Sequence, residues 1–253
     1  MNPDPVQHAS RLRIVLVGTQ HPGNIGSAAR ALKTMGLARL VLVAPEKAPN
    51  AESSALAAGA DDVLEAAVTY PDLAAAVADC GLVLGCTARS RRVQLEELLP
   101  REAAARAVAE AAGGAEVALV FGRERTGLEN AELQLCHAAV HIPANPGYSS
   151  LNLAAAVQVL AYELRLALLE ATVPTAPAEP RDPPASHEHM EGLFGHLAET
   201  LEQIDFHKGR APESAMRKLR RLFLRARLDQ REVRLLHGIL ADAQRMAMLA
   251  GRR

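Results

Sequence analysis

Three short segments of the 253-residue chain combine polar and flexible residues in a pattern typical of ligand-binding loops. They are residues 21–30 (HPGNIGSAAR), 121–128 (FGRERTGL) and 142–152 (IPANPGYSSLN). Each segment follows a short apolar run and precedes a helical pattern, so each is predicted to be a loop at the carboxyl end of a strand. Such loops gather at one edge of a parallel sheet, where α/β enzymes bind their ligands.

The first segment carries two glycines and an arginine. Gly23 and Gly26 are expected to let the backbone turn tightly and approach a ligand, and the helix start that follows offers N–H groups to an anion. Arg30 lies four residues after Gly26, which predicts a place about one helical turn in, near the loop mouth. The alternatives are a surface arginine on a polar helix face and, for the loop, a nicotinamide-dependent oxidoreductase. The latter needs Gly-x-Gly-x-x-Gly, which this loop lacks.

The second segment places three charged residues between two glycines. Arg123 and Arg125 are suited to phosphate because the guanidinium fork makes paired hydrogen bonds, and Glu124 is expected to hold one arginine in place. A solvated charged turn is the alternative interpretation. The buried strand that precedes the segment favours a site loop.

The third segment is rich in side-chain amides and hydroxyls. Ser150 is predicted as the N-cap of a long helix over residues 150–170, a structural role that stands beside a catalytic one. Asn152 is open to the same two interpretations. His137 and His141 precede this segment without an acid to orient either, and they lie in a predicted strand, so neither a Ser-His-Asp triad nor a metal site is expected.

Apolar runs and helical patterns alternate along the first two thirds of the chain. Strands are predicted at residues 13–18, 40–43, 82–84, 117–121 and 139–142, and helices at residues 24–35, 72–79, 101–112, 129–136 and 150–170. This alternation predicts an α/β domain with a largely parallel sheet.

Prolines then crowd residues 174–184, which predicts a linker over residues 172–187 between a domain at residues 1–171 and another at residues 188–253. The second domain is expected to be a small α-helical one, with helices at residues 190–204, 213–227 and 230–249.

Charge is divided unevenly between the two parts. Residues 206–253 hold 13 Lys or Arg against 4 Asp or Glu, a net charge of +9, whereas the remaining 15 basic and 25 acidic residues give −10. A basic segment on an acidic body indicates a polyanionic partner such as nucleic acid.

The composition also excludes several classes of protein. No apolar run approaches the roughly 20 residues that span a bilayer, and the N-terminus has no signal pattern, so a cytoplasmic protein without a membrane partner is expected. Cys80, Cys86 and Cys136 lack a Cys-x-x-Cys pair, which predicts ordinary packed thiols and no structural metal.

In their order, spacing and residue types, the three segments resemble the motifs of the SPOUT superfamily of RNA methyltransferases, in particular its TrmJ family. The stretch Asn-Pro-Gly-Tyr-Ser-Ser-Leu-Asn-Leu is especially specific, and the resemblance extends to the basic residues 216–227. It implies a SPOUT-type parallel sheet with a C-terminal trefoil knot near residues 80–165. It also implies a homodimer with sites at the subunit interface, and no further protein partner.

The resemblance implies 2'-O-methylation of a cytidine or uridine at position 32 of the tRNA anticodon loop, with S-adenosyl-L-methionine as cofactor and no metal. Arg30 and Ser150 match the catalytic residues. The cofactor would be held by Cys86, Thr87, Ala88, Gly122, Ile142, Ser149, Ser150 and Leu151. The RNA would be bound by Asn24, Arg89, Arg91, Arg92, Arg123, Arg125, Asn152 and the basic C-terminal segment.

The family assigns proton acceptance to the arginine matching Arg30. A guanidinium stays protonated in proteins, so either a substrate phosphate relays the proton or Arg30 stabilises the developing alkoxide. Two rival functions stay open: a ribosomal RNA 2'-O-methyltransferase of the same fold, and a non-catalytic RNA-binding protein. Most ribosomal RNA enzymes of this branch carry an extra N-terminal domain, whereas here the first predicted strand begins at Arg13. The intact Arg30 and third segment speak against loss of catalysis.

Overall fold

The computed structural model describes residues 5–88, 95–171, 182–208 and 211–251. The chain divides into two compact units, Met1–Pro177 and Ala178–Arg253. The predicted linker at residues 172–187 lies for its first ten residues outside the described part of the chain.

The first unit is built on a parallel sheet in the order β3-β2-β1-β6-β4-β7-β5, and every pairing in it is parallel. Its strands are β1 Leu12–Val17, β2 Arg39–Val43, β3 Val68–Tyr70, β4 Cys80–Cys86, β5 Glu96–Leu98, β6 Glu116–Phe121 and β7 Ala138–Val140. The α/β prediction and all five predicted strands are confirmed. The edge strands β3 and β5 were not predicted, because each has three residues of which two are exposed, without an apolar run.

The helices of the first unit are α1 Pro5–Ala9, α2 Pro22–Thr34, α3 Ala51–Ala57, α4 Asp61–Glu65, α5 Leu73–Ala76, α6 Pro100–Ala112, α7 Asn130–Leu133 and α8 Leu153–Glu170. The predicted helices at residues 72–79 and 129–136 shorten to the four-residue α5 and α7. Helices α1, α3 and α4 were not predicted.

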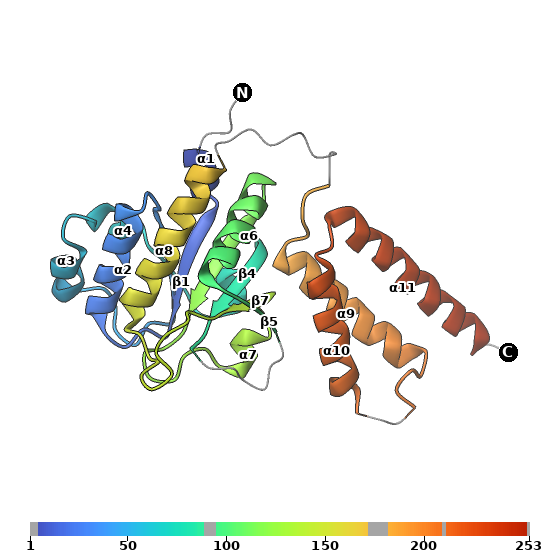
Figure 1. Ribbon diagram of the computed structural model, residues 1–253. Coiled ribbons are helices and arrows are strands. Elements are labelled where there is room, and N and C mark those ends of the chain that lie inside the picture. The colour runs from blue at the N-terminus through green and yellow to red at the C-terminus, as the bar shows by residue number, and fades with distance from the viewer. Residues whose placement is uncertain (1–4, 89–94, 172–181, 209–210, 252–253) are drawn as a thin grey trace. The chain divides into compact units, whose positions relative to one another are not determined.

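Helices α2, α6 and α8 lie on one side of the sheet (Figure 1), and alternate residues of the central strands face two different hydrophobic layers. On one face, side chains such as Ile14 and Leu119 pack against helices α2, α6 and α8. On the other face, Val15 and Val120 pack against residues of α5 and α7. This burial on both faces explains why these strands read as continuous apolar runs.

Helix α2 begins at Pro22, a residue suited to the first position of a helix because its missing N–H is not needed there. Gly23 and Gly26 therefore lie inside the helix. A Cβ at Gly26 would lie 1.9 Å from the carbonyl oxygen of Ser53, so this glycine allows α2 to pack closely on α3. The expected tight turn at these glycines is wrong, and helix packing is their role.

Helix α8 begins at Leu153, later than predicted, and its N-cap is Asn152. The Asn152 side-chain oxygen accepts hydrogen bonds from the N–H groups of Ala154 (2.9 Å) and Ala155 (3.3 Å). The prediction of Ser150 as the N-cap is wrong. Both residue types cap helices well, and only the fold selects between them.

The second unit contains α9 His187–Gln203, α10 Pro212–Ala226 and α11 Gln230–Ala250, which confirms its predicted helical character. Its small core includes Met190, Phe194, Leu224 and Val233.

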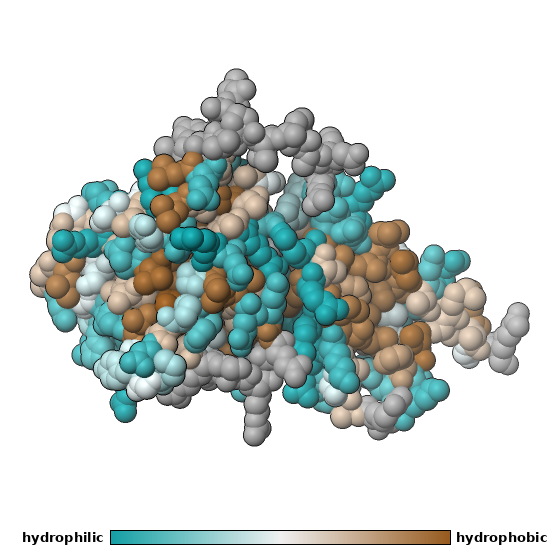
Figure 2. Space-filling model, in the orientation of Figure 1, coloured by the Kyte–Doolittle hydropathy of each residue, from teal (hydrophilic) through white to brown (hydrophobic). Residues whose placement is uncertain are grey.

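An exposed apolar stripe runs along α11, formed by Leu235, Ile239, Met246 and Leu249 at helical spacing. Figure 2 shows hydrophobic residues gathered over this C-terminal unit. Among the described helices, none is long and apolar enough to cross a membrane.

Candidate active site

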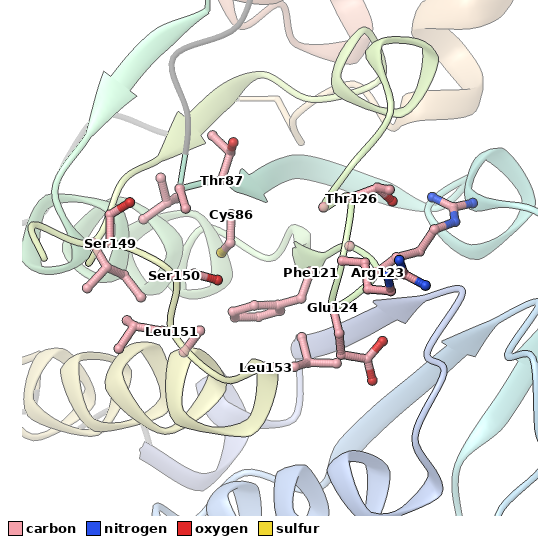
Figure 3. A pocket seen from close by; sticks show the side chains of 17 residues that line it. Cys86, Thr87, Phe121, Arg123, Glu124, Thr126, Ser149, Ser150, Leu151 and Leu153 are labelled. Carbon is pink, nitrogen blue, oxygen red and sulfur yellow. The ribbon is translucent and has the colours of Figure 1, made fainter. Parts of the chain in front are cut away.

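A pocket opens at the carboxyl ends of three adjacent strands, β6, β4 and β7. Its volume is about 160 Å³, roughly ten times the space that one water molecule needs, so it can admit part of an organic ligand. Its walls are the loops after these strands and the first turn of α8, as Figure 3 shows. The second and third sequence segments meet here, as predicted.

A chain of side-chain hydrogen bonds joins all three segments beside this pocket. The carboxylate of Glu124 accepts a hydrogen bond from Asn24 Nδ2 at 2.9 Å. The Oδ1 atom of Asn24 in turn accepts one from Asn152 Nδ2 at 3.0 Å. Because Asn152 also caps α8, this chain connects the starts of α2 and α8 to the loop after β6.

Glu124 also accepts hydrogen bonds from the backbone N–H groups of Gln20 (2.9 Å) and His21 (3.2 Å). Partial burial would raise the pKa of this carboxyl, but the hydrogen bonds from Asn24, Gln20 and His21 outweigh it and hold the pKa below its usual range. The expectation that Glu124 holds an arginine is therefore wrong: it anchors the first segment instead.

Arg123 forms ion pairs with two glutamates, one in α7 and one at the N-cap of α7. Its Nη1 atom lies 3.0 Å from Glu132 and 3.6 Å from Glu129. Arg125 is exposed, and both arginines line the pocket. Arg125 is thus the more accessible of the two for an anionic ligand.

The loop that carries these arginines closes tightly on itself. The N–H of Gly127 donates to the carbonyl of Arg123 at 2.8 Å, and Gly127 has a φ of +69°, which favours glycine. A Cβ at Gly122 would lie 2.2 Å from backbone atoms of Gly127 and Leu128. Both glycines of the second segment are therefore required by the turn itself.

All eight residues predicted to hold a cofactor line the pocket: Cys86, Thr87, Ala88, Gly122, Ile142, Ser149, Ser150 and Leu151. The sequence reasoning missed apolar lining residues at the borders of the segments, namely Phe121, Val140, Leu153 and Ala156. Phe121 is the first residue of the second segment and the other three lie within four residues of the third, which was the available signal. In Figure 3 the side chains of Cys86, Phe121 and Ser150 gather at the centre of the pocket.

The pocket combines apolar walls with backbone and hydroxyl groups. The N–H of Thr87 already donates to the carbonyl of Val140 at 3.0 Å. This N–H is therefore not the group of Thr87 that a ligand would bind. Apolar side chains such as Ile142 and Leu151 suit a flat ring, while Ser149 and Ser150 offer hydroxyls. This mixture fits a nucleoside-like ligand with an apolar ring and polar ends. No metal-binding group of three His, Cys, Asp or Glu occurs among the described residues.

Arg30 lies away from this pocket. It is exposed on α2, eight residues after Pro22 and so about 12 Å along the helix axis, and it is not among the lining residues. The expected place one turn into the helix is wrong because α2 starts before the first glycine. Arg89, Arg91 and Arg92 lie outside the described residues.

Cys86 is a packed thiol, as predicted for all three cysteines, which are free. Burial raises its pKa above the usual range, and the neighbouring Cys136 adds to this. A thiol that stays protonated is a poor nucleophile.

We therefore expect Cys86→Ala to retain the methyl transfer that the sequence resemblance implies, measured with labelled S-adenosyl-L-methionine, and the wild-type activity to survive iodoacetamide. Loss of activity in both experiments would indicate a covalent role for the thiol.

Replacing Glu124 by glutamine should loosen the contact between the three segments. Both carboxylate oxygens of Glu124 accept hydrogen bonds from N–H groups. In glutamine an NH2 group replaces one of these oxygens and cannot accept, so at least one hydrogen bond is lost at a cost of about 1 kcal/mol. We expect methyl transfer to fall about tenfold and the free energy of unfolding in urea to fall by that amount at pH 7.

The acid dependence of stability gives an independent check of Glu124. Its pKa is lowered in the folded state, so its contribution is present above the unfolded pKa of about 4.3 and is lost as the pH falls through the folded value. In Glu124→Gln the free energy of unfolding should therefore fall less steeply as the pH is lowered. Glu46→Gln is the matched control, since the exposed Glu46 side chain accepts a hydrogen bond from the Gln20 side chain at 2.9 Å. Equal effects of the two variants would contradict the prediction.

Comparison with known proteins agrees with the fold. Residues 11–162 match the SpoU rRNA Methylase family, and residues 188–252 match the C-terminal domain of tRNA methyltransferase TrmJ. The chain is 49% identical over 234 residues to tRNA (cytidine/uridine-2'-O-)-methyltransferase TrmJ of Pectobacterium atrosepticum, covering 92% of this chain and 97% of the relative.

Two solved structures show the same architecture. TrmJ from Z. mobilis superposes with a TM-score of 0.77 at 36% identity, covering 91% of this chain and 97% of that one. The SpoU methyltransferase AviRb from Streptomyces viridochromogenes, in complex with AdoMet, has a TM-score of 0.50 at 22% identity and covers 62% of this chain and 60% of its own, a likeness of fold alone. The chain belongs to the TrmJ family, within the SpoU methylases of the SPOUT superfamily.

Proposed function

We propose that this protein is an S-adenosyl-L-methionine-dependent tRNA 2'-O-ribose methyltransferase that acts on a cytidine or uridine at position 32 of the anticodon loop. The observation that carries the proposal is the pocket at the ends of β6, β4 and β7, lined by all eight residues predicted to hold the cofactor. Membership of the TrmJ family along almost the whole chain supports it.

The lining residues fit the cofactor by chemistry. Apolar side chains from Phe121, Ile142 and Leu151 suit the adenine ring, and the backbone of the loops with the hydroxyls of Ser149 and Ser150 suits the polar parts. When bound, the cofactor supplies an electrophilic methyl group on a sulfonium sulfur.

The residues of the chain then have to place a ribose 2'-hydroxyl in line with that methyl group. We assign this positioning to Ser150, which lies in the pocket, with Asn24 and Asn152 fixing the loops around it. As the new oxygen–carbon bond forms, the bond between the methyl carbon and the cofactor sulfur would break and leave S-adenosylhomocysteine, and the hydroxyl proton would pass to a phosphate of the RNA. Arg30 is assigned to stabilise the developing alkoxide, because a guanidinium stays protonated and is a poor proton acceptor.

A homodimer would reconcile this role with the position of Arg30. Within one subunit Arg30 is exposed and does not line the pocket. We propose that a second subunit receives Arg30 at its own pocket, so that each site is completed across the interface. The exposed apolar stripe of α11 offers further surface for such an association.

The C-terminal unit is proposed to bind tRNA. On α10, Arg217, Lys218, Arg221 and Arg225 are exposed and fall on one side of the helix at helical spacing. Arg220 instead pairs with Glu191 and lies over the Phe194 ring, 4.6 Å from its centroid. Neutralisation of phosphates by the exposed set would release counterions and drive binding.

Three further expectations belong to the same proposal. Residues 1–171 form the methyltransferase domain and residues 188–253 the RNA-binding extension, joined by the linker at residues 172–187. The trefoil knot stays a prediction of the resemblance. The protein is proposed to act in the cytoplasm, where its tRNA substrate is.

The test is transfer of labelled methyl groups from S-adenosyl-L-methionine to unmodified bulk tRNA and, separately, to ribosomal RNA. Products are mapped by nuclease digestion and mass spectrometry. Label at the ribose of position 32 supports the proposal. Transfer to ribosomal RNA alone would overturn the substrate, and no transfer to either would favour the non-catalytic alternative. A melting temperature raised by S-adenosylhomocysteine but not by nicotinamide cofactors would exclude the oxidoreductase.

A further inference from the structure

We infer that the Tyr148 ring stacks on the base of the nucleotide whose ribose enters the pocket. This inference rests on the proposed function and names the residue that holds the base, which the catalytic and cofactor assignments leave without a partner. It is carried by the exposure of Tyr148, by its fixed backbone and by its position directly before Ser149, which lines the pocket.

Tyr148 is unusually exposed for an aromatic residue. Tyr148 is 82% exposed, whereas Tyr162 on α8 and Phe206 in the C-terminal unit are each 49% exposed. An aromatic ring left in water loses the apolar contact that normally accounts for its presence in a protein. A ring in this state is available for a ligand that presents a flat apolar face.

The backbone beneath this ring is held in a turn. The N–H of Tyr148 donates to the carbonyl of Asn145 at 2.8 Å, and the N–H of Gly147 donates to Asn145 Oδ1 at 3.0 Å. Asparagine side chains commonly fix turns in this way. The ring is therefore presented from a fixed backbone, and less ordering is needed when a base stacks on it.

The position of Tyr148 matches the geometry of a nucleotide. Ser149, Ser150 and Leu151 follow it directly and line the pocket, and Leu151 is 41% exposed. The ribose 2'-carbon adjoins the carbon that carries the base. A 2'-hydroxyl directed at Ser150 therefore leaves its base outside the pocket, beside the segment that carries Tyr148.

RNA suits this position better than a protein surface. Tyr148 is the only aromatic ring of the segment at residues 142–152, and its direct neighbours Gly147 and Ser149 are small, whereas protein interfaces bury contiguous apolar patches. The exposed Arg125, which lines the same pocket, supplies positive charge for the adjoining phosphate. Every base offers a flat face, so stacking accepts cytidine and uridine alike.

The experiment compares steady-state methyl transfer to unmodified tRNA by wild type and Tyr148→Ala. We expect the KM for tRNA to rise about tenfold, because stacking contributes roughly that factor per base or more, with the KM for S-adenosyl-L-methionine and the melting temperature unchanged. Tyr148→Phe keeps the ring and should restore most of the lost affinity. Tyr162→Ala is the matched control and should behave as wild type.

A spectroscopic measurement reports on the stack itself. A fluorescent cytidine analogue replaces the nucleotide at position 32, and S-adenosylhomocysteine takes the place of the reactive cofactor. Binding of wild type is expected to quench the fluorescence, and Tyr148→Ala is expected to abolish that quenching while RNA still binds at higher concentration. Retained quenching in Tyr148→Ala would overturn the inference.

The failure of this inference differs from the failure of the proposed function. If wild type methylates tRNA and Tyr148→Ala shows an unchanged KM, only the stacking role is wrong. If wild type transfers no methyl group to tRNA, the proposed function itself fails. If Tyr148→Ala changes the oligomeric state in light scattering, the ring contacts a second copy of the chain and the inference is overturned.

Discussion

Replacing Arg30 by alanine is expected to lower the rate of methyl transfer to tRNA by about 100-fold to 1,000-fold, the loss typical when a group that stabilises a developing oxyanion is removed. The fold should remain intact, because Arg30 is exposed on α2 and its side chain supports no core packing. The measurement is single-turnover transfer of labelled methyl groups to unmodified tRNA. Circular dichroism and the melting temperature report on folding.

Arg101→Ala is the matched control for this variant. Arg101 is also an exposed arginine on a helix, and its 3.3 Å contact with Glu163 is a surface ion pair of little energetic value. Arg30→Lys separates charge from shape, since lysine keeps the charge but loses the planar fork. Full activity in Arg30→Ala would place the centre of the chemistry elsewhere.

Mixed dimers test whether Arg30 acts at the pocket of its own subunit or at that of the other subunit. Mixing Arg30→Ala with an inactive pocket variant such as Gly122→Val, whose added side chain collides with Gly127, should form mixed dimers. If Arg30 serves the pocket of the other subunit, one site in each mixed dimer combines an intact pocket with an intact arginine, and activity returns. If Arg30 serves its own subunit, no mixed dimer is active.

Replacing Arg13 by methionine is expected to give the largest loss of stability, about 3 kcal/mol in the free energy of unfolding. The Arg13 side chain is 3% exposed and forms a two-pronged pair with Asp79, with contacts of 2.6 and 2.8 Å. It also lies 2.9 Å from Glu116 and donates to the carbonyl of Ala76 at 3.1 Å. Methionine would leave these acceptors without their buried partner, at the base of the central strand β1.

Asp79 and Glu116 keep some access to water, with side chains 59% and 24% exposed, which places the loss at the lower end of the range for buried ion pairs. Urea unfolding at pH 7 measures the effect. Arg101→Ala is again the control and should change stability by at most about 1 kcal/mol. A loss of that small size in Arg13→Met would contradict the prediction.

Acid unfolding tests the same cluster with a defined sign. Burial would raise the pKa of Asp79, but the hydrogen bonds and charge of Arg13 outweigh it and lower the pKa. The contribution of Asp79 is therefore present above the unfolded pKa of about 3.9 and is lost as the pH falls through the folded value. In Arg13→Met this part of the acid dependence should disappear.

The local pattern of the sequence was sufficient for the elements that are buried on both sides or amphipathic. Strands β1 and β6 contain the continuous apolar runs 14–17 and 117–121, and helices such as α6 and α11 repeat apolar residues at helical spacing. Hydrophobic periodicity is a property of neighbouring residues, so it is visible without a fold. The edge strands β3 and β5 lack that signal, because their identity depends on pairing with a neighbouring strand.

The sequence also predicted that the second and third segments would meet at one sheet edge, because loops after adjacent parallel strands converge there. The resemblance implied eight of the residues that line the pocket. The tertiary structure decided what those residues do to one another. In the structure Glu124 bonds the first segment and not an arginine, and Asn152, not Ser150, caps helix α8. Arg13 is enclosed in an ion-pair cluster. The structure also places Arg30 away from its own pocket. Each of these outcomes depends on contacts between residues far apart in the chain, and spacing along a sequence does not encode such distances.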